Sequence, residues 1–195
     1  MKTFLCLLLL SAIALPMTTH AQTKTETLVL GGGCFWCLDA TFQLVPGVKS
    51  VVCGYAGGSA VNPSYEQVCT GSTGHAEVVK IEYDPAQTSE EKLLEFFWKI
   101  HDPTSLNAQG DDHGTQYRSI ILCANDTQKT SAEKSKASFQ AKFSDPIVTE
   151  IVPLKVFYAA EDYHQDYFRK NPNTGYCRLV VKSKVDKAKQ VLAPH

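Results

Sequence analysis

The chain has 195 residues, of which 44% are hydrophobic, and its formal net charge at neutral pH is −1. This length suits a single domain with a sizeable buried core. A balanced charge gives no attraction to nucleic acid or to an anionic membrane surface, so both are excluded as partners.

The first 21 residues differ from the rest of the chain. Lys2 supplies a positive charge, residues 4–14 are apolar, and Ala21 is a small residue suited to cleavage. This pattern predicts a secretory signal peptide over residues 1–21, too short for a lasting transmembrane helix. We expect residues 22–195 to form one mature domain, periplasmic or secreted, with no membrane anchor.

Hydrophobic periodicity and turn residues predict a mixed fold. Thr88 or Ser89 should begin the helix expected over 88–101, with Glu91 as the capping-box partner of Thr88. After Glu161 the chain should be loop-rich, with a short terminal helix over 184–192. The order β-α-β-β-α-β predicts an α+β two-layer sandwich of the split βαβ (ferredoxin-like) type. The expected strands cover 28–30, 48–55, 76–83, 119–123 and 147–154, and the expected helices cover 34–44, 64–68, 88–101 and 127–143.

The first candidate site is Cys34, which follows three glycines at the end of the strand over 28–30. A thiol in the first turn of a helix feels the positive end of the peptide dipoles, which favours the thiolate. Glycines such as Gly33 let another molecule approach the sulfur closely. We therefore predict that Cys34 is a nucleophile.

Cys34 and Cys37 form a C-x-x-C pair, which is typical of thiol–disulfide exchange. A zinc site would need a second pair of ligands at comparable spacing, and the sequence has none, so we expect no metal. Between the two cysteines, Phe35 fits a core position slightly better, whereas Trp36 is expected to wall a pocket beside the sulfur.

The remaining cysteines differ in their surroundings. Cys53 and Cys123 lie in apolar strands and should behave as small core residues. Cys177 ends the turn-rich segment 171–177, where an exposed, mobile thiol would suit the role of a resolving cysteine. Cys69 is expected to be structural.

Two polar segments are further candidates. If Glu77 points inward, burial would raise its pKa and make it a proton donor, although the strand pattern favours an exposed carboxylate. His75 is expected to be structural. The loop over 110–119 is rich in polar side chains, and the spacing of His101, Asp112 and their neighbours matches no familiar metal site.

Together these motifs closely resemble the A-type peptide methionine sulfoxide reductases, over essentially the whole of the expected mature chain. The matching segments are Gly32-Gly33-Cys34-Phe35-Trp36, Gly54-Tyr55-Ala56-Gly57-Gly58, Asn62-Pro63-Ser64-Tyr65, Gly74-His75-Ala76-Glu77, His101-Asp102-Pro103, 112–119, 158–165, Asn171-Pro172 and Gly175-Tyr176-Cys177.

The resemblance implies a role for each matching residue. Cys34 would attack the sulfur of the S epimer of methionine sulfoxide and become a sulfenic acid, which a second thiol converts to a disulfide. The resemblance replaces the exposed interpretation of Glu77 with a proton donor to the sulfoxide oxygen. Tyr65 and Tyr117 would hydrogen-bond that oxygen, Phe35 and Trp36 would hold the S-methyl group with Gly33 beside them, and Asp112 would lie at the rim.

The same resemblance implies no cofactor and a thioredoxin or thioredoxin-like domain as reductant, relayed through the membrane if the chain is exported. Oxidised proteins and free methionine sulfoxide would be the substrates, and nothing demands more than a monomer.

Three features depart from the family's usual pattern. Cys37 stands where glycine is common, Asp39 stands where glutamate is common, and no second recycling cysteine follows Cys177. Two thiols are therefore candidates for the one that resolves the sulfenic acid of Cys34. Cys177 is favoured because of its mobile segment, and Cys37, constrained within a helix, is the alternative or a relay.

A different class of function also stays open. A secreted thiol–disulfide oxidoreductase would use Cys34 and Cys37 alone, without Glu77, Tyr65 or Tyr117, and normally with a thioredoxin-like fold. A binding module for oxidised methionine would need Cys34 to be catalytically silent.

Overall fold

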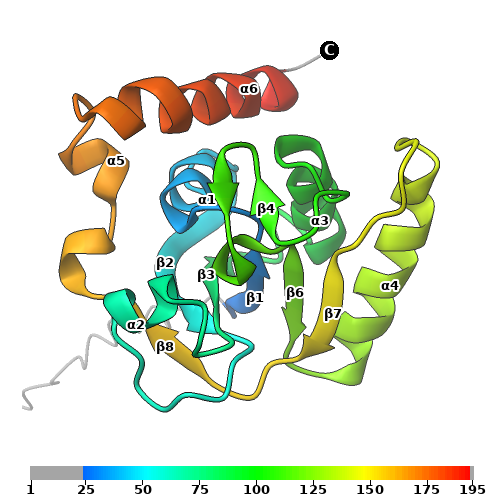
Figure 1. Ribbon diagram of the computed structural model, residues 1–195. Coiled ribbons are helices and arrows are strands. Elements are labelled where there is room, and N and C mark those ends of the chain that lie inside the picture. The colour runs from blue at the N-terminus through cyan, green and yellow to red at the C-terminus, as the bar shows by residue number, and fades with distance from the viewer. Residues whose placement is uncertain (1–23, 194–195) are drawn as a thin grey trace, which may run out of the picture.

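The computed structural model describes residues 24–193, so the predicted signal peptide lies outside the described residues. Six strands form one sheet in the order β7-β6-β1-β3-β2-β8 (Figure 1). All neighbouring strands are antiparallel except β6 and β7. The strands are β1 (Glu26–Gly31), β2 (Val48–Ala56), β3 (Ala76–Tyr83), β6 (Ile120–Cys123), β7 (Glu150–Pro153) and β8 (Phe157–Ala159), and β4 (Ala108–Gln109) with β5 (Asp112–His113) forms a separate hairpin.

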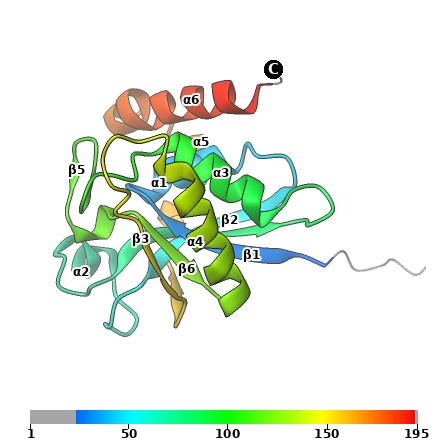
Figure 2. The ribbon, with the colours of Figure 1, turned by 90° about the vertical axis from the view of Figure 1, so that its right-hand side faces the viewer.

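Helices cover one face of the sheet. Figure 2 shows α6 lying above α1 and α3, with α4 beside them. The opposite face is covered by loops and by a smaller apolar cluster that includes Val29, Val78 and Leu122. The helices are α1 (Phe35–Phe42), α2 (Tyr65–Cys69), α3 (Glu90–Ile100), α4 (Asp126–Gln140), α5 (Tyr167–Lys170) and α6 (Lys182–Leu192).

The alternation of side chains along β3 positions the site. Successive residues of a strand point to opposite faces, so Val79 and Ile81 face the helices while Val78 faces the loops. Glu77 shares the parity of Val79 and Ile81 and is 1% exposed. The strand therefore directs this carboxyl group into the layer between the sheet and α1.

The mixed α+β class predicted from the sequence is confirmed, with two differences in detail. Ser89, not Thr88, begins α3, because the Ser89 hydroxyl accepts the Lys92 N–H at 3.4 Å. The capping box expected between Thr88 and Glu91 is therefore wrong. Strand β8 falls outside the predicted strands.

The C-terminal segment is more helical than predicted. After α5, a π-helical turn (Cys177–Val181) runs directly into α6. The buried residues of this segment follow helical spacing, which is the signal that the sequence interpretation missed. They are Cys177, Val181, Val185 and Ala188.

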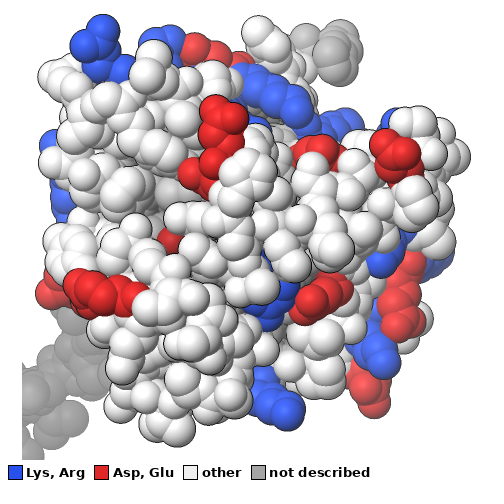
Figure 3. Space-filling view, in the orientation of Figure 1, with Lys and Arg blue, Asp and Glu red and all other residues white. Residues whose placement is uncertain are grey.

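The surface agrees with the nearly balanced charge. In Figure 3, acidic and basic residues are spread over the visible face and no extended patch of one sign appears. Across residues 24–193, no helix is both long enough and apolar enough to span a bilayer.

Candidate active site

Cys34 lies at the junction between β1 and α1. It is the N-cap of α1 in an extended conformation, with φ −60° and ψ 127°, and it follows Gly33, whose φ is +94°. A positive φ strains any residue with a Cβ, so glycine suits this position. The Gly33 N–H donates to the Tyr117 carbonyl at 3.1 Å, which fixes the turn. The predicted placement of Cys34 at a helix start is confirmed.

The Cys34 thiol is largely withdrawn from solvent, at 8% exposure. Burial raises its pKa well above the usual value, a hydrogen bond with Cys37 and the charge of Glu77 add to the rise, and a hydrogen bond from Tyr176 opposes it. The helix start was expected to favour the thiolate. In the resting structure desolvation outweighs that effect, and the thiol keeps its proton at neutral pH.

Glu77 lies beside the first residues of α1. The Glu77 Oε2 accepts the Phe35 N–H at 3.0 Å. In the sheet, Glu77 of β3 lies opposite Tyr55 of β2. Burial raises the pKa of Glu77 to about 8, the bond from Phe35 opposes the rise, and Asp112 adds to it. The exposed carboxylate favoured by the strand pattern is wrong. Glu77 is a buried carboxyl group that carries a proton at neutral pH.

Two tyrosines flank this carboxyl group from different elements. Tyr65 is the first residue of α2, and Tyr117 ends a 3-10 turn (Thr115–Tyr117). Burial raises the pKa of both phenols, and the charge of Glu77 contributes to both shifts. Both hydroxyl groups therefore keep their protons at neutral pH and can act as donors. Both phenols lie near enough to Glu77 for its charge to raise their pKa, and the charge of Cys34 also raises the pKa of Tyr117.

The two aromatic residues after Cys34 have different surroundings. Phe35 is 1% exposed and its ring lies 6.4 Å from the Tyr65 ring, nearly parallel to it. Trp36 is half-buried and stacks on Tyr167 at 3.7 Å with an interplanar angle of 6°. Within residues 24–193, the buried Trp36 Nε1 has no hydrogen-bond partner. Phe35 is a core residue next to Cys34, and Trp36 packs against Tyr167 and Tyr176.

Asp112 and the glycine turn border the thiol on the other side. Asp112, in β5, accepts the Tyr176 hydroxyl at 2.7 Å. A cavity of about 460 Å³ lies between α1, this hairpin and the C-terminal helices, and Cys34, Cys37, Asp112 and Tyr176 line it. A Cβ on Gly33 would lie 2.7 Å from the side chain of Gln109, so this side chain fills the space that the glycine leaves.

The cysteines of residues 24–193 are all free thiols. Cys37, in the first turn of α1, lies close enough to Cys34 to raise the pKa of that thiol. Cys177 is fully buried at the start of the π-helical turn. The predicted exposed, mobile Cys177 is therefore wrong, because the helical packing of the segment after it carries the thiol into the core. The buried positions of Cys53 and Cys123 are confirmed.

The histidines have structural partners. His75 Nδ1 accepts the Gly58 N–H at 3.1 Å, and its Nε2 lies 2.8 Å from the Ala60 carbonyl, which agrees with the structural role expected for it. His101 lies between the Phe97 carbonyl, at 2.6 Å, and the Ser119 hydroxyl, at 2.8 Å. Among the residues that the structure describes, no group of three or more potential ligands is arranged to hold a metal.

The sequence interpretation gave no individual role to four residues around the site. Glu161 and His164 follow β8, Tyr167 stacks on Trp36, and Tyr176 contacts Cys34 and Asp112. All four lie in matching segments or next to them, but no local pattern shows that they fold back onto α1. Only the tertiary structure brings them there.

A buried thiol that meets a protonated carboxyl group and two phenols defines a thiol-dependent enzyme site. The family described as "Peptide methionine sulfoxide reductase" matches residues 26–194. The peptide methionine sulfoxide reductase MsrA of Nautilia profundicola is 60% identical over 159 residues, covering 82% of this chain and 91% of that one. The MsrA of Leptospira borgpetersenii is 56% identical and covers 83% and 92%.

Solved structures agree with these sequence matches. Methionine sulfoxide reductase A of Corynebacterium diphtheriae superimposes with a TM-score of 0.76 at 39% identity, covering 79% of this chain and 78% of that one. Reduced Mxr1 from Saccharomyces cerevisiae gives 0.76 at 36% identity, covering 82% and 92%. The chain belongs to the peptide methionine sulfoxide reductase family, A type. It is an oxidoreductase that returns methionine sulfoxide to methionine.

Proposed function

We propose that the chain reduces the S epimer of methionine sulfoxide, protein-bound and free, with Cys34 as nucleophile and Glu77 as proton donor. The observation that carries this proposal is the protonated Glu77 carboxyl group, buried beside the thiol, with Tyr65 and Tyr117 near it. A sulfoxide is a poor electrophile until its oxygen is protonated or strongly hydrogen-bonded. Comparing reduction of the separated S and R epimers tests the assignment.

The first step forms one oxidised cysteine for each methionine. The Cys34 sulfur attacks the sulfoxide sulfur, and Glu77 protonates the sulfoxide oxygen while Tyr65 and Tyr117 hydrogen-bond it. The bond between the oxygen and the methionine sulfur then breaks as the oxygen passes to Cys34, so methionine leaves and Cys34 becomes a sulfenic acid. The proton of the Cys34 thiol replaces the one that Glu77 gave, so the step consumes no net proton. Phe35 and Trp36 would hold the S-methyl group, Gly33 would lie beside it, and Asp112 would lie at the rim.

The geometry at α1 favours Cys37 as the thiol that first reacts with the sulfenic acid. A disulfide between two residues inside one helix is strained, but Cys34 is an extended N-cap and not a helical residue. The two thiols lie close together, because Cys37 is among the groups that raise the pKa of Cys34. We propose that Cys37 forms the first disulfide with loss of water, and that Cys177 then exchanges with it as the second resolving thiol.

The two serine variants of the resolving thiols should therefore behave differently after one turnover. With one equivalent of substrate, the Cys177→Ser protein is expected to lose two titratable thiols, because Cys34 and Cys37 still pair. The Cys37→Ser protein should retain a sulfenic acid longer, which a dimedone-type probe would capture. If Cys177→Ser trapped the sulfenic acid and Cys37→Ser did not, Cys177 would be the direct partner.

The reductant is proposed from chemistry and from one solved complex. The recycled disulfide needs two electrons from a dithiol, and Mxr1 from S. cerevisiae in complex with Trx2 superimposes with a TM-score of 0.54 at 25% identity. We propose a thioredoxin-like domain as donor here, relayed through the membrane if residues 1–21 direct export to a periplasm. A pulldown with Cys37→Ser or Cys177→Ser that traps no mixed disulfide would count against this donor.

The rate of the first step should rise with pH up to about 8 and level off above it. The reactive form of Glu77 is the protonated form, and burial raises its pKa to about 8, so alkaline pH removes the acid. Below its raised pKa the Cys34 thiolate gains about tenfold per pH unit, so above pH 8 this gain and the loss of the Glu77 acid offset each other. Single-turnover methionine formation between pH 6 and 9.5 measures this; a rate that rises throughout the range would contradict Glu77 as the acid.

A second candidate function, thiol–disulfide exchange through Cys34 and Cys37, is favoured only by the closeness of these two thiols. Thiol–disulfide exchange gives no reason for the buried proton on Glu77.

As to architecture, we propose that residues 22–195 form one monomeric domain around a split βαβ unit. In support, the connections β1–α1–β2 and β3–α3–β6 each pass over one intervening strand of the sheet.

A further inference from the structure

Glu161 joins three segments that are distant in the sequence. It follows β8, and its two carboxylate oxygens accept two different donors. One oxygen accepts the Tyr65 N–H of α2 at 3.0 Å, and the other accepts the Tyr55 hydroxyl of β2 at 2.8 Å. The carboxylate therefore ties the start of α2 to the sheet.

This attachment matters because α2 has five residues, and Val68 is its one fully buried side chain that packs into the core. Its capping box between Ser64 and Gln67 is internal and does not fix the helix to the sheet. The Tyr65 ring lies against Phe35 and against His164, with its centroid 4.4 Å from that of His164. Ring contacts permit sliding, whereas a hydrogen bond to the first N–H sets the position of the helix along its axis.

The carboxylate is well suited to this contact. Burial acts to raise the pKa of Glu161, but hydrogen bonds from its own N–H, Tyr65 and Tyr55 outweigh it and lower the pKa. Glu161 is therefore ionised at neutral pH, and hydrogen bonds to an ionised acceptor are about twice as strong as neutral ones. His164 Nε2 is 3.9 Å away, and burial lowers the pKa of this imidazole, so no cation competes for the carboxylate at that side.

We propose that Glu161 is a positioning residue that holds the Tyr65 hydroxyl where the sulfoxide oxygen forms its hydrogen bonds. The inference rests on the role proposed for Tyr65 and extends it to a residue that makes no contact with the substrate. Glu161 acts through the backbone of α2, so its removal displaces Tyr65 without removing the phenol. A displacement of about 1 Å at a reacting centre can cost up to about a hundredfold in rate.

A double-mutant cycle tests the proposal. We expect Glu161→Ala to slow single-turnover methionine formation about tenfold. Tyr65→Phe should slow methionine formation by up to about a hundredfold. This is the lower end of the range for the loss of one hydrogen-bond donor, because the Tyr117 donor remains. If Glu161 acts through Tyr65, the double variant should be no slower than Tyr65→Phe alone.

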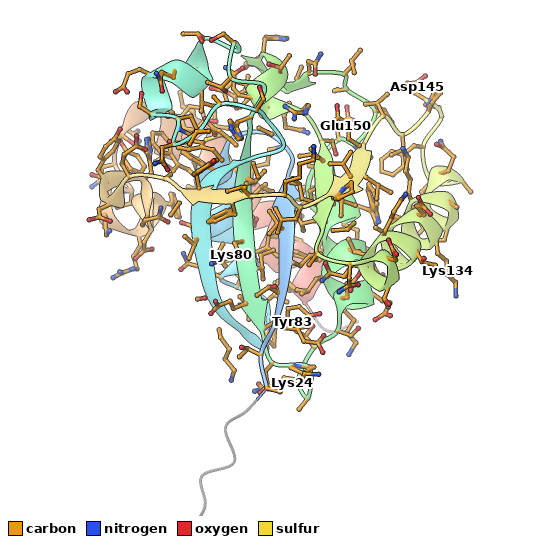
Figure 4. All side chains as sticks on the ribbon, turned by 90° about the horizontal axis from the view of Figure 1, so that it is seen from below. Lys24, Lys80, Tyr83, Lys134, Asp145 and Glu150 are labelled. Carbon is orange, nitrogen blue, oxygen red and sulfur yellow. The ribbon has the colours of Figure 1, made fainter. Side chains whose placement is uncertain are left out.

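Two further variants separate positioning from general stability. Glu161→Gln keeps an oxygen that can accept the Tyr65 N–H, so it should restore the rate to within a few-fold of the parent. Glu26→Ala is the matched control, because Glu26 accepts the hydroxyl of a buried tyrosine, Tyr83, at 3.0 Å. Figure 4 shows Tyr83 near Lys24, where the described chain begins, at the end of the sheet away from α2. The control should leave the rate unchanged.

Each outcome decides the matter. A normal rate for Tyr65→Phe would refute the role of Tyr65 and the inference with it. A slow Tyr65→Phe with a normal Glu161→Ala, or effects that multiply in the double variant, would overturn only the inference. An equal loss of rate in Glu26→Ala would show that the effect is one of stability.

Discussion

Glu77→Gln is expected to slow the first chemical step by about 10²–10⁴-fold, the range typical of a lost general acid. Glutamine keeps the shape of the side chain and can still accept the Phe35 N–H, but it has no acidic proton to give to the sulfoxide oxygen. The levelling of the rate near pH 8 should vanish together with the acid. Single-turnover methionine formation across pH, with titration of Cys34 as a check, measures both effects.

Glu82→Gln is the matched control for this variant. Glu82 lies on the same strand, and its Oε2 accepts the Ser50 hydroxyl at 2.9 Å on the face opposite to the site. Its rate and pH profile should match those of the parent. A normal rate for Glu77→Gln would leave the buried carboxyl group without a chemical role. If Glu77→Gln kept the same levelling near pH 8, that feature would belong to another group.

Cys34→Ser should remove methionine formation altogether, in both single-turnover and steady-state assays. The serine hydroxyl is a far weaker nucleophile than a thiol, and it has no sulfur to oxidise. The loss should therefore exceed that of every other single substitution considered. Because Cys34 is the N-cap of α1 and makes no side-chain cap hydrogen bond, serine should not weaken the helix start.

Cys123→Ala is a suitable control for the loss of a thiol. Cys123 is buried in β6, at the edge of the helix layer, and is not part of the site. The variant should lose a little stability, about 1 kcal/mol for a small buried deletion, and keep its full rate. Residual turnover by Cys34→Ser at the parental rate would show that another cysteine attacks the sulfoxide.

The sequence predicted the start of the site well because its signals are local. Cys34 follows glycines that end β1 and form the turn into α1, and a strand followed by turn residues and a helix is readable from spacing alone. The alternating strand over 76–83 was equally clear. The pattern failed for Glu77 because its charge suggested the solvent-exposed face of the strand. Its position, two residues before Val79, places it on the face that packs against the helices. Only the resemblance to known reductases corrected it.

The surroundings of the site depend on contacts that no local pattern records. Glu161 reaches Tyr65 across 96 residues of chain, and Tyr176 reaches Asp112 across 64. Cys177 looked mobile because proline, asparagine and glycine precede it, yet the helix that follows buries the thiol. The turn-rich residues therefore predicted a loop correctly only as far as Cys177, where the helical segment begins.

The most direct test of the account is reduction of the separated S and R epimers of a blocked methionine sulfoxide, with dithiothreitol as the reductant. The account predicts that the S epimer is converted to methionine while the R epimer persists, and that Cys34→Ser converts neither. If neither epimer reacts while the Cys34 thiol of the parent still titrates, the assignment fails and disulfide exchange through Cys34 and Cys37 becomes the better explanation. Equal consumption of both epimers would contradict the proposed specificity.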